Sequence, residues 1–102
     1  MEKLIKDGMV AVLYSPGHGA GWYSWHGIEA LVYDPVVVDM VLREVDPEEI
    51  VEYCEQKYGQ KYYGGVDDLQ VEWIPVGRRF IINEYDGFES IIMENEVMWL
   101  IA

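Results

Sequence analysis

The segment Ser15-Pro16-Gly17-His18-Gly19-Ala20-Gly21 has the most unusual composition in the chain, with three glycines, one proline and one histidine. Such a run forms no regular helix or strand, and its small residues would let backbone N–H groups point at an anion. The spacing matches neither the dinucleotide-binding G-x-G-x-x-G pattern nor a P-loop. Two interpretations stay open. The segment is a connection that needs positive φ, or Gly17, His18, Gly19 and Gly21 line a ligand pocket.

Aromatic residues follow this loop directly, with Trp22, Tyr23 and Trp25 next to His26. An extended backbone here would place Trp22 on one face and Tyr23 with Trp25 on the other. Exposed Trp and Tyr side chains anchor protein interfaces and also stack on nucleotide rings. Trp22 and Trp25 are therefore candidate partner anchors, and Trp22 and Tyr23 are candidate stacking residues. The alternative is that both tryptophans belong to the core.

Patterns for catalysis or metal binding are weak. His18 and His26 are the two histidines of the chain, and a zinc site would need both of them plus a carboxylate such as Glu29. No recognisable ligand spacing is present, and no nucleophile elbow surrounds Ser15 or Ser24. We therefore expect no catalytic residue, no metal and no cofactor, in a protein that is not an enzyme.

Arg78 and Arg79 form the one pair of adjacent basic residues. Neighbouring side chains of a strand point to opposite faces, so these two would not clamp one group together. One interpretation is an ion pair with a carboxylate on an adjacent strand. The other is recognition of a phosphate or carboxylate of a ligand, together with the Gly17–Gly21 loop, Trp22 and Tyr23.

Acidic residues dominate the chain, because 7 Lys and Arg against 19 Asp and Glu give a net charge of −12 over 102 residues. This balance excludes sequence-independent nucleic-acid binding and binding to anionic membranes, since both require Lys and Arg. The charge either only keeps the protein dispersed or steers it onto a basic partner. In the second case, which is our leading hypothesis, the docking charges are Glu48, Glu52, Glu55, Asp86 and Glu89.

Helix signals are clearest at two Asp-Pro pairs. Asp34-Pro35 and Asp46-Pro47 each place an N-cap carboxylate before a proline that has no N–H to lose. They predict helices over about Pro35–Arg43 and Pro47–Tyr58. Cys54 lies on the apolar side of the second helix, so we expect it to be buried.

Strand signals fill the remainder. The apolar run Met9–Tyr14 predicts a strand covered on both faces. Residues 28–33 fit a strand or a helix start. Asp86-Gly87 predicts a hairpin turn, within a C-terminal meander of strands at Leu69–Trp73, Arg78–Tyr85, Phe88–Met93 and Val97–Ile101. The expected fold is one α+β domain over residues 1–102, an antiparallel sheet of about four to six strands with two short helices packed on one face.

The sequence shows neither a candidate membrane span nor a recognisable signal peptide. No window approaches the roughly 18–20 apolar residues of a membrane span, and the N-terminus lacks the features of a signal peptide. With a single cysteine there is no internal disulfide. These observations predict a cytoplasmic protein.

The stretch Val10–Trp25, with its Ser15-Pro16-Gly17-x-Gly19-Ala20-Gly21-Trp22 loop, resembles small uncharacterised acidic proteins of bacteriophage and prophage origin. The likeness extends to Asp34-Pro35, Tyr63-Gly64-Gly65, Trp73-Ile74-Pro75-Val76-Gly77 and Tyr85-Asp86-Gly87. It implies a source class and no activity. Small acidic phage proteins are often accessory factors, and some inhibit host defence proteins or sequester nucleotide signals.

Two function hypotheses follow. The first is a non-enzymatic, phage-type inhibitor in the host cytoplasm that docks an acidic face on the basic surface of a host protein, with no direct contact to nucleic acid or membrane. The alternative is a module that binds and sequesters a small anionic ligand of the nucleotide class. The oligomeric state does not follow from the sequence.

Overall fold

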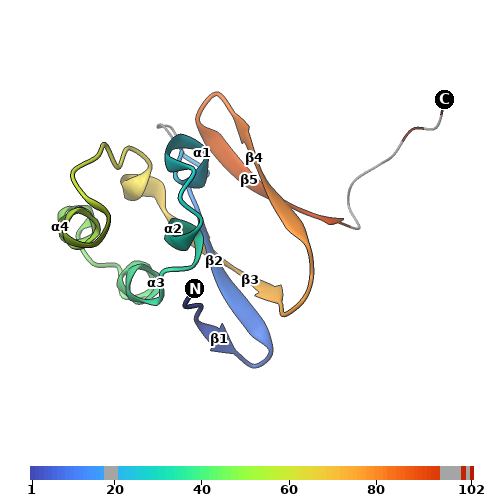
Figure 1. Cartoon of the computed structure of the whole chain (residues 1–102), viewed down its shortest axis with the longest axis horizontal. Helices are drawn as coiled ribbons and strands as arrows, with labels where there is room; N and C mark the ends of the chain where they lie inside the picture. Colours follow the sequence, from blue (N-terminus) through green and yellow to red (C-terminus); the bar gives the residue numbers. More distant parts are fainter. Residues whose placement is uncertain (18–20, 95–99, 101) are drawn as a thin grey trace.

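The computed structural model describes residues 1–17, 21–94, 100 and 102. Its strands are β1 (Ile5–Lys6), β2 (Met9–Tyr14), β3 (Gln70–Pro75), β4 (Phe80–Tyr85) and β5 (Phe88–Met93). Its helices are α1 (Tyr23–His26), α2 (Ala30–Tyr33), α3 (Pro35–Leu42), α4 (Pro47–Tyr58) and the short 3-10 helix η1 (Val66–Asp68). Helices combined with antiparallel strands confirm the α+β class (Figure 1).

The strands are divided between two sheets instead of one continuous meander. β2 pairs with β1 and β3 on its two sides, while β4 and β5 form a separate hairpin. Gly77, with φ +87°, sits in the turn after β3 and helps the chain leave the first sheet. The hairpin then places Phe80, Ile82, Ile91 and Met93 on one face, packed against the first sheet. Layering buries this apolar face, which edge-to-edge pairing would leave exposed.

The two Asp-Pro helix starts are confirmed. The Asp34 carboxylate accepts the N–H groups of Val36 and Val37, and Asp46 accepts the N–H of Glu48. Helix α4 has the predicted bounds and α3 ends one residue earlier than predicted.

The segment after the glycine loop is helical and does not have the extended backbone that was considered for it. It forms α1, which ends at His26 and is capped by Gly27 with φ +65°. Residues 28–33, which were open between strand and helix, include the single helical turn α2. Together these turns add two helices to the two that the sequence predicted.

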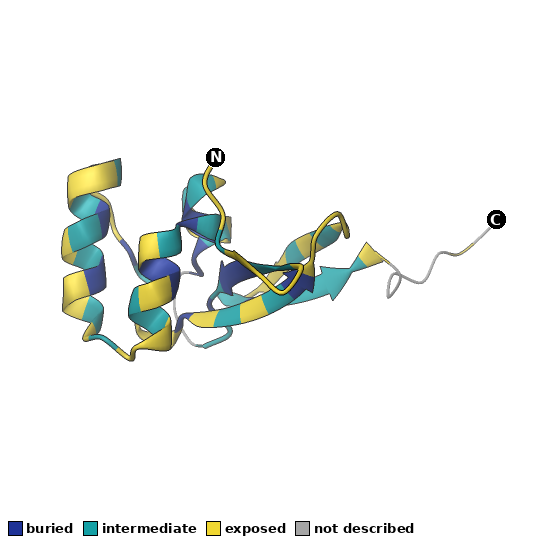
Figure 2. Ribbon diagram, turned by 90° about the horizontal axis from the view of Figure 1, so that it is seen from below, coloured by how far each residue is buried: buried dark blue, intermediate teal, exposed yellow. Residues whose placement is uncertain are grey.

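Strand β2 is buried on both faces, as its composition predicts. Ala11 and Leu13 face a core shared with α3 and α4, whereas Val12 faces Val32 and the hairpin. Figure 2 shows the buried residues gathered along this central layer, with exposed residues on the outer helix faces. Cys54 is buried in the core that β2 shares with α3 and α4, as expected. No described helix is long and apolar enough to cross a membrane.

Candidate functional site

The described glycines of the loop serve close packing. A Cβ on Gly17 would overlap the Asp68 side chain, and one on Gly65 would overlap the Gly21 carbonyl. Gly21 also has φ +84°, a conformation that favours glycine. Gly17, Gly21 and Trp22 are not among the residues that line the cleft between α1–α2 and β4, so the structure does not join this part of the predicted ligand site to Tyr23, Arg78 and Arg79 there. His18 and Gly19 lie outside the described residues.

Glu89 is not a surface charge but a buried one, with only 2% of its surface exposed. Its Oε1 accepts the Ser15 N–H at 2.9 Å, and its Oε2 accepts the Ser24 N–H at 2.8 Å and the Ser24 hydroxyl at 2.7 Å. The Glu89 N–H in turn donates to the Ser15 carbonyl at 2.9 Å. Its predicted role in docking is therefore wrong. Instead it ties β5 to the glycine loop and to α1, because burying a carboxylate requires such donors.

The prediction that Trp22 is an exposed anchor or stacking residue is also wrong, because Trp22 is fully buried. Its indole N–H donates to the Leu31 carbonyl at 2.8 Å. The His26 ring packs against it and against Tyr63, with centroid separations of 5.8 and 4.9 Å. Burial, and secondarily Lys61, lowers the His26 pKa, which favours the neutral ring. The tryptophan expected on the other side of the segment behaves differently.

Trp25 is 56% exposed and meets the ring of Tyr62 edge to face, with centroids 5.8 Å apart. Tyr62, in the loop after α4, is itself 64% exposed. Such a paired, exposed aromatic surface is the kind that anchors protein interfaces. Sequence reasoning named Trp25 but missed Tyr62, because their contact depends on how α1 folds back on that loop.

One surface of α4, which we call the acidic stripe, carries Glu48, Glu52 and Glu55. They recur at i, i+4 and i+7 and so share a helix face. Glu48 and Glu52 are exposed and Glu55 is half-buried. None of the three forms an ion pair with a described residue. Asp86 is exposed at the hairpin tip, but α2 and β2 separate that hairpin from α4 (Figure 1).

The buried Asp34 holds α4 in place. Beyond capping α3, its carboxylate accepts the hydroxyls of Tyr53 at 2.9 Å and Tyr58 at 2.6 Å, and it pairs with Lys57 at 3.2 Å. Burial alone would raise the Asp34 pKa, but the combined hydrogen bonds from Tyr58, Tyr53, Lys57 and the Val37 N–H lower it overall. One side of α4 is thus bonded to the core while the acidic stripe faces solvent.

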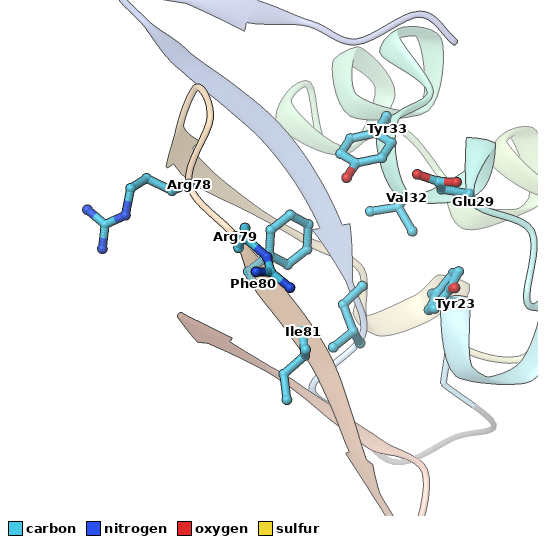
Figure 3. A pocket seen from close by; sticks show the side chains of 9 residues that line it. Tyr23, Glu29, Val32, Tyr33, Arg78, Arg79, Phe80 and Ile81 are labelled. Carbon is cyan, nitrogen blue, oxygen red and sulfur yellow. The ribbon is translucent and has the colours of Figure 1, made fainter. Parts of the chain in front are cut away.

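A cleft of about 520 Å³ opens on the other side of the molecule, between α1–α2 and β4 (Figure 3). Three of its residues were singled out from the sequence, namely Tyr23, Arg78 and Arg79. Sequence reasoning missed the others, because pairing these helices with β4 is a long-range event. They are Val32, Tyr33, Phe80, Ile81 and Ile82, together with Glu29, which the sequence had suggested only as a possible zinc ligand.

The two arginines at the cleft differ in direction. Arg79 lies beside Phe80 at the rim, whereas Arg78 extends away from the helices (Figure 3). Arg79 meets the Glu94 carboxylate at 3.4 Å, which is the cross-strand ion pair expected as one interpretation. Both partners are largely exposed, so this pair contributes little stability.

Comparisons with protein families, curated proteins and solved structures find no match for this chain. Function therefore has to be inferred from the acidic stripe, the exposed aromatic pair and the cleft.

Proposed function

We propose that this protein is a non-enzymatic interaction protein that docks its acidic stripe on a basic surface of a partner protein. The observation that carries the proposal is the set of outward carboxylates on α4 that are unpaired among the described residues. Because helix geometry holds them in one row, their potentials add along a single face. Such a face raises the association rate with a basic partner and disfavours acidic ones.

Trp25 and Tyr62 supply the apolar contact of the proposed interface. Charged rims set orientation and association rate, while buried aromatic side chains supply most of the affinity in measured interfaces. Tyr62 lies in the loop that leaves α4, so the pair and the stripe are linked through one element. The resemblance to phage and prophage proteins supports a host protein as partner and the host cytoplasm as the place of action.

The test is affinity capture from host lysate at low and high salt, with immobilised wild-type protein and two matched variants. Glu48→Gln/Glu52→Gln removes two charges from the acidic stripe. Glu2→Gln/Glu72→Gln removes two exposed charges elsewhere. We expect a partner that is captured by the wild type and the control, lost from the stripe variant, and weakened by salt.

A third variant, Trp25→Ala, separates the aromatic contribution. It should weaken capture of the same partner while leaving the salt dependence of the remaining binding unchanged, because no charge is altered. Capture that ignores both salt and the stripe substitutions would contradict the proposal.

A further inference from the structure

We propose that the cleft between α1–α2 and β4 binds a nucleoside phosphate, a small ligand that combines an aromatic ring with a phosphate group. The cleft volume of about 520 Å³ lies within the range of roughly 300–1,000 Å³ typical of ligand sites. The proposal is independent of the docking face, because α4 contributes no residue to the cleft.

Aromatic side chains line both walls of the cleft. Tyr23 and Tyr33 come from the helical side and Phe80 comes from β4 (Figure 3). All three are half-buried and pack against Val12, Val32 and Ile74, the buried residues between β2 and the β4–β5 hairpin. This packing sets their positions. Rings held in this way can receive a nucleobase by stacking or edge contact, with little conformational entropy to lose.

Basic residues are concentrated at the cleft, although the chain as a whole is strongly acidic. Arg78 and Arg79 line the cleft, and Lys3 lines an adjoining cavity that shares Tyr33, Arg78 and Phe80 with it. These are three of only 7 Lys and Arg in a chain of net charge −12. The distant carboxylates of α4 act weakly here, because salt screens exposed charges beyond about 8–10 Å.

Each polar group of the cleft suits one part of the ligand. Arginine matches phosphate geometry with two parallel N–H donors, and Arg79 can exchange its weak contact with Glu94 for a phosphate. Glu29 faces the cleft from the start of α2 and can accept a hydrogen bond from a ribose hydroxyl or base amine (Figure 3). A ligand with ring, hydroxyl and phosphate uses all of these groups at once, which inorganic phosphate cannot.

The experiment is isothermal titration of the full chain with AMP, GMP, CMP and UMP, with the matching nucleosides, and with inorganic phosphate. We expect at least one mononucleotide to bind more tightly than its nucleoside and than phosphate. Arg79→Gln should weaken that binding about tenfold, because a hydrogen bond to a charged group is lost. Arg78→Gln should weaken it less, because the Arg78 side chain lines the cleft but extends away from its helical wall (Figure 3).

Arg43→Gln is the matched control, since Arg43 is an exposed arginine beyond the end of α3 that pairs with Asp39. It should leave the affinity unchanged. Phe80→Leu tests the ring contact and should weaken binding in protein shown by circular dichroism to be folded. Four results would overturn the proposal: no mononucleotide binds, phosphate or nucleoside alone binds as tightly, Arg43→Gln matches Arg79→Gln, or folded Phe80→Leu keeps full affinity.

Discussion

Helix α4, which carries the acidic stripe, and β4, which lines the cleft, lie on opposite sides of α2 and β2 (Figure 1). Each of the two surfaces depends on one buried carboxylate. Asp34 bonds α4 to the start of α3, and Glu89 bonds β5 to the glycine loop and α1. Both residues are only 2% exposed. Two surfaces of different chemistry are therefore positioned by the same device, an acid held among hydrogen-bond donors.

The two carboxylates differ in the donors that hold them. Asp34 receives two tyrosine hydroxyls, two backbone N–H groups and the Lys57 ammonium. Glu89 receives its three hydrogen bonds from two serines, and no described cation pairs with it. When one donor to Asp34 is removed, several others still stabilise its carboxylate. Glu89 has fewer donors, so the loss of one should cost more stability.

The largest effect should come from Glu89→Gln. An amide replaces one acceptor oxygen with a donor, so either the buried Ser15 N–H or the Ser24 N–H and hydroxyl lose their acceptor. We expect unfolding free energy to fall by about 2–3 kcal/mol, and by more for Glu89→Ala, which also leaves a cavity. Urea unfolding followed by circular dichroism measures both.

Glu72→Gln is the control for charge, because Glu72 is an exposed carboxylate on β3. It should change stability little. If Glu89→Gln and Glu72→Gln were equally stable, the Glu89 hydrogen bonds would not hold the hairpin to α1 as described.

A smaller effect is expected at Asp34. Asn still caps a helix well, but its amide group faces the tyrosine hydroxyls, so Asp34→Asn should cost about 1–2 kcal/mol at neutral pH. The Asp34 pKa is lowered from its ordinary value of 3.8. Its stabilisation is therefore present above 3.8 and is lost as pH falls through the lower native pKa.

Urea unfolding of wild type and Asp34→Asn at a series of pH values checks this sign. The stability difference should be constant well above pH 3.8 and should shrink below it. A difference that grows on acidification would show that Asp34 is not a stabilising charged acceptor.

Cys54 offers a local reporter for α4. The thiol is buried, and burial first, with the Asp34 charge second, raises its pKa to about 12. The native protein should react slowly with a thiol reagent, because the thiolate is the reactive form. Asp34→Asn should speed labelling by releasing α4. Equal labelling of Asp34→Asn and wild type would indicate that Asp34 does not hold this helix.

The smallest effect should come from Tyr58→Phe. It removes one of several donors to Asp34 and should lower stability by about 1 kcal/mol. Tyr85→Phe, at an exposed position on β4, is the matched control and should have no effect. A Tyr58→Phe loss as large as that of Glu89→Gln would contradict the redundancy that distinguishes the two sites.

Local signals in the sequence predicted the structure well, and long-range pairings did not. The Asp-Pro helix starts and the Asp86-Gly87 turn act within a few residues, and the turn has φ +53° and +88° as type I′ requires. The division into two sheets depends on β2 meeting β3, which pairs Tyr14 with Gln70. Nothing local marks that partner. The predicted strand Val97–Ile101 lies largely outside the described residues.

The candidate sites show the same limit at single residues. Trp22 and Trp25 belong to one short segment, yet one is buried and the other 56% exposed, because Trp22 precedes α1 with a non-helical backbone whereas Trp25 lies within the helix. Glu89 could have been placed inside from its pattern, since it alternates with Ile91 and Met93 on the inner hairpin face. Its serine donors come from the glycine loop and α1, a pairing that composition does not reveal.

The central claim is that the chain carries two separate binding surfaces, an acidic one on α4 and a cationic, aromatic one at the cleft. The most direct test maps amide chemical shifts while the protein is titrated with a lysine-rich peptide and, separately, with a mononucleotide. The account predicts that the peptide shifts residues of α4 and the mononucleotide shifts Tyr23, Glu29, Tyr33 and Phe80. Shifts from both probes at the same residues, or scattered evenly over the chain, would contradict it.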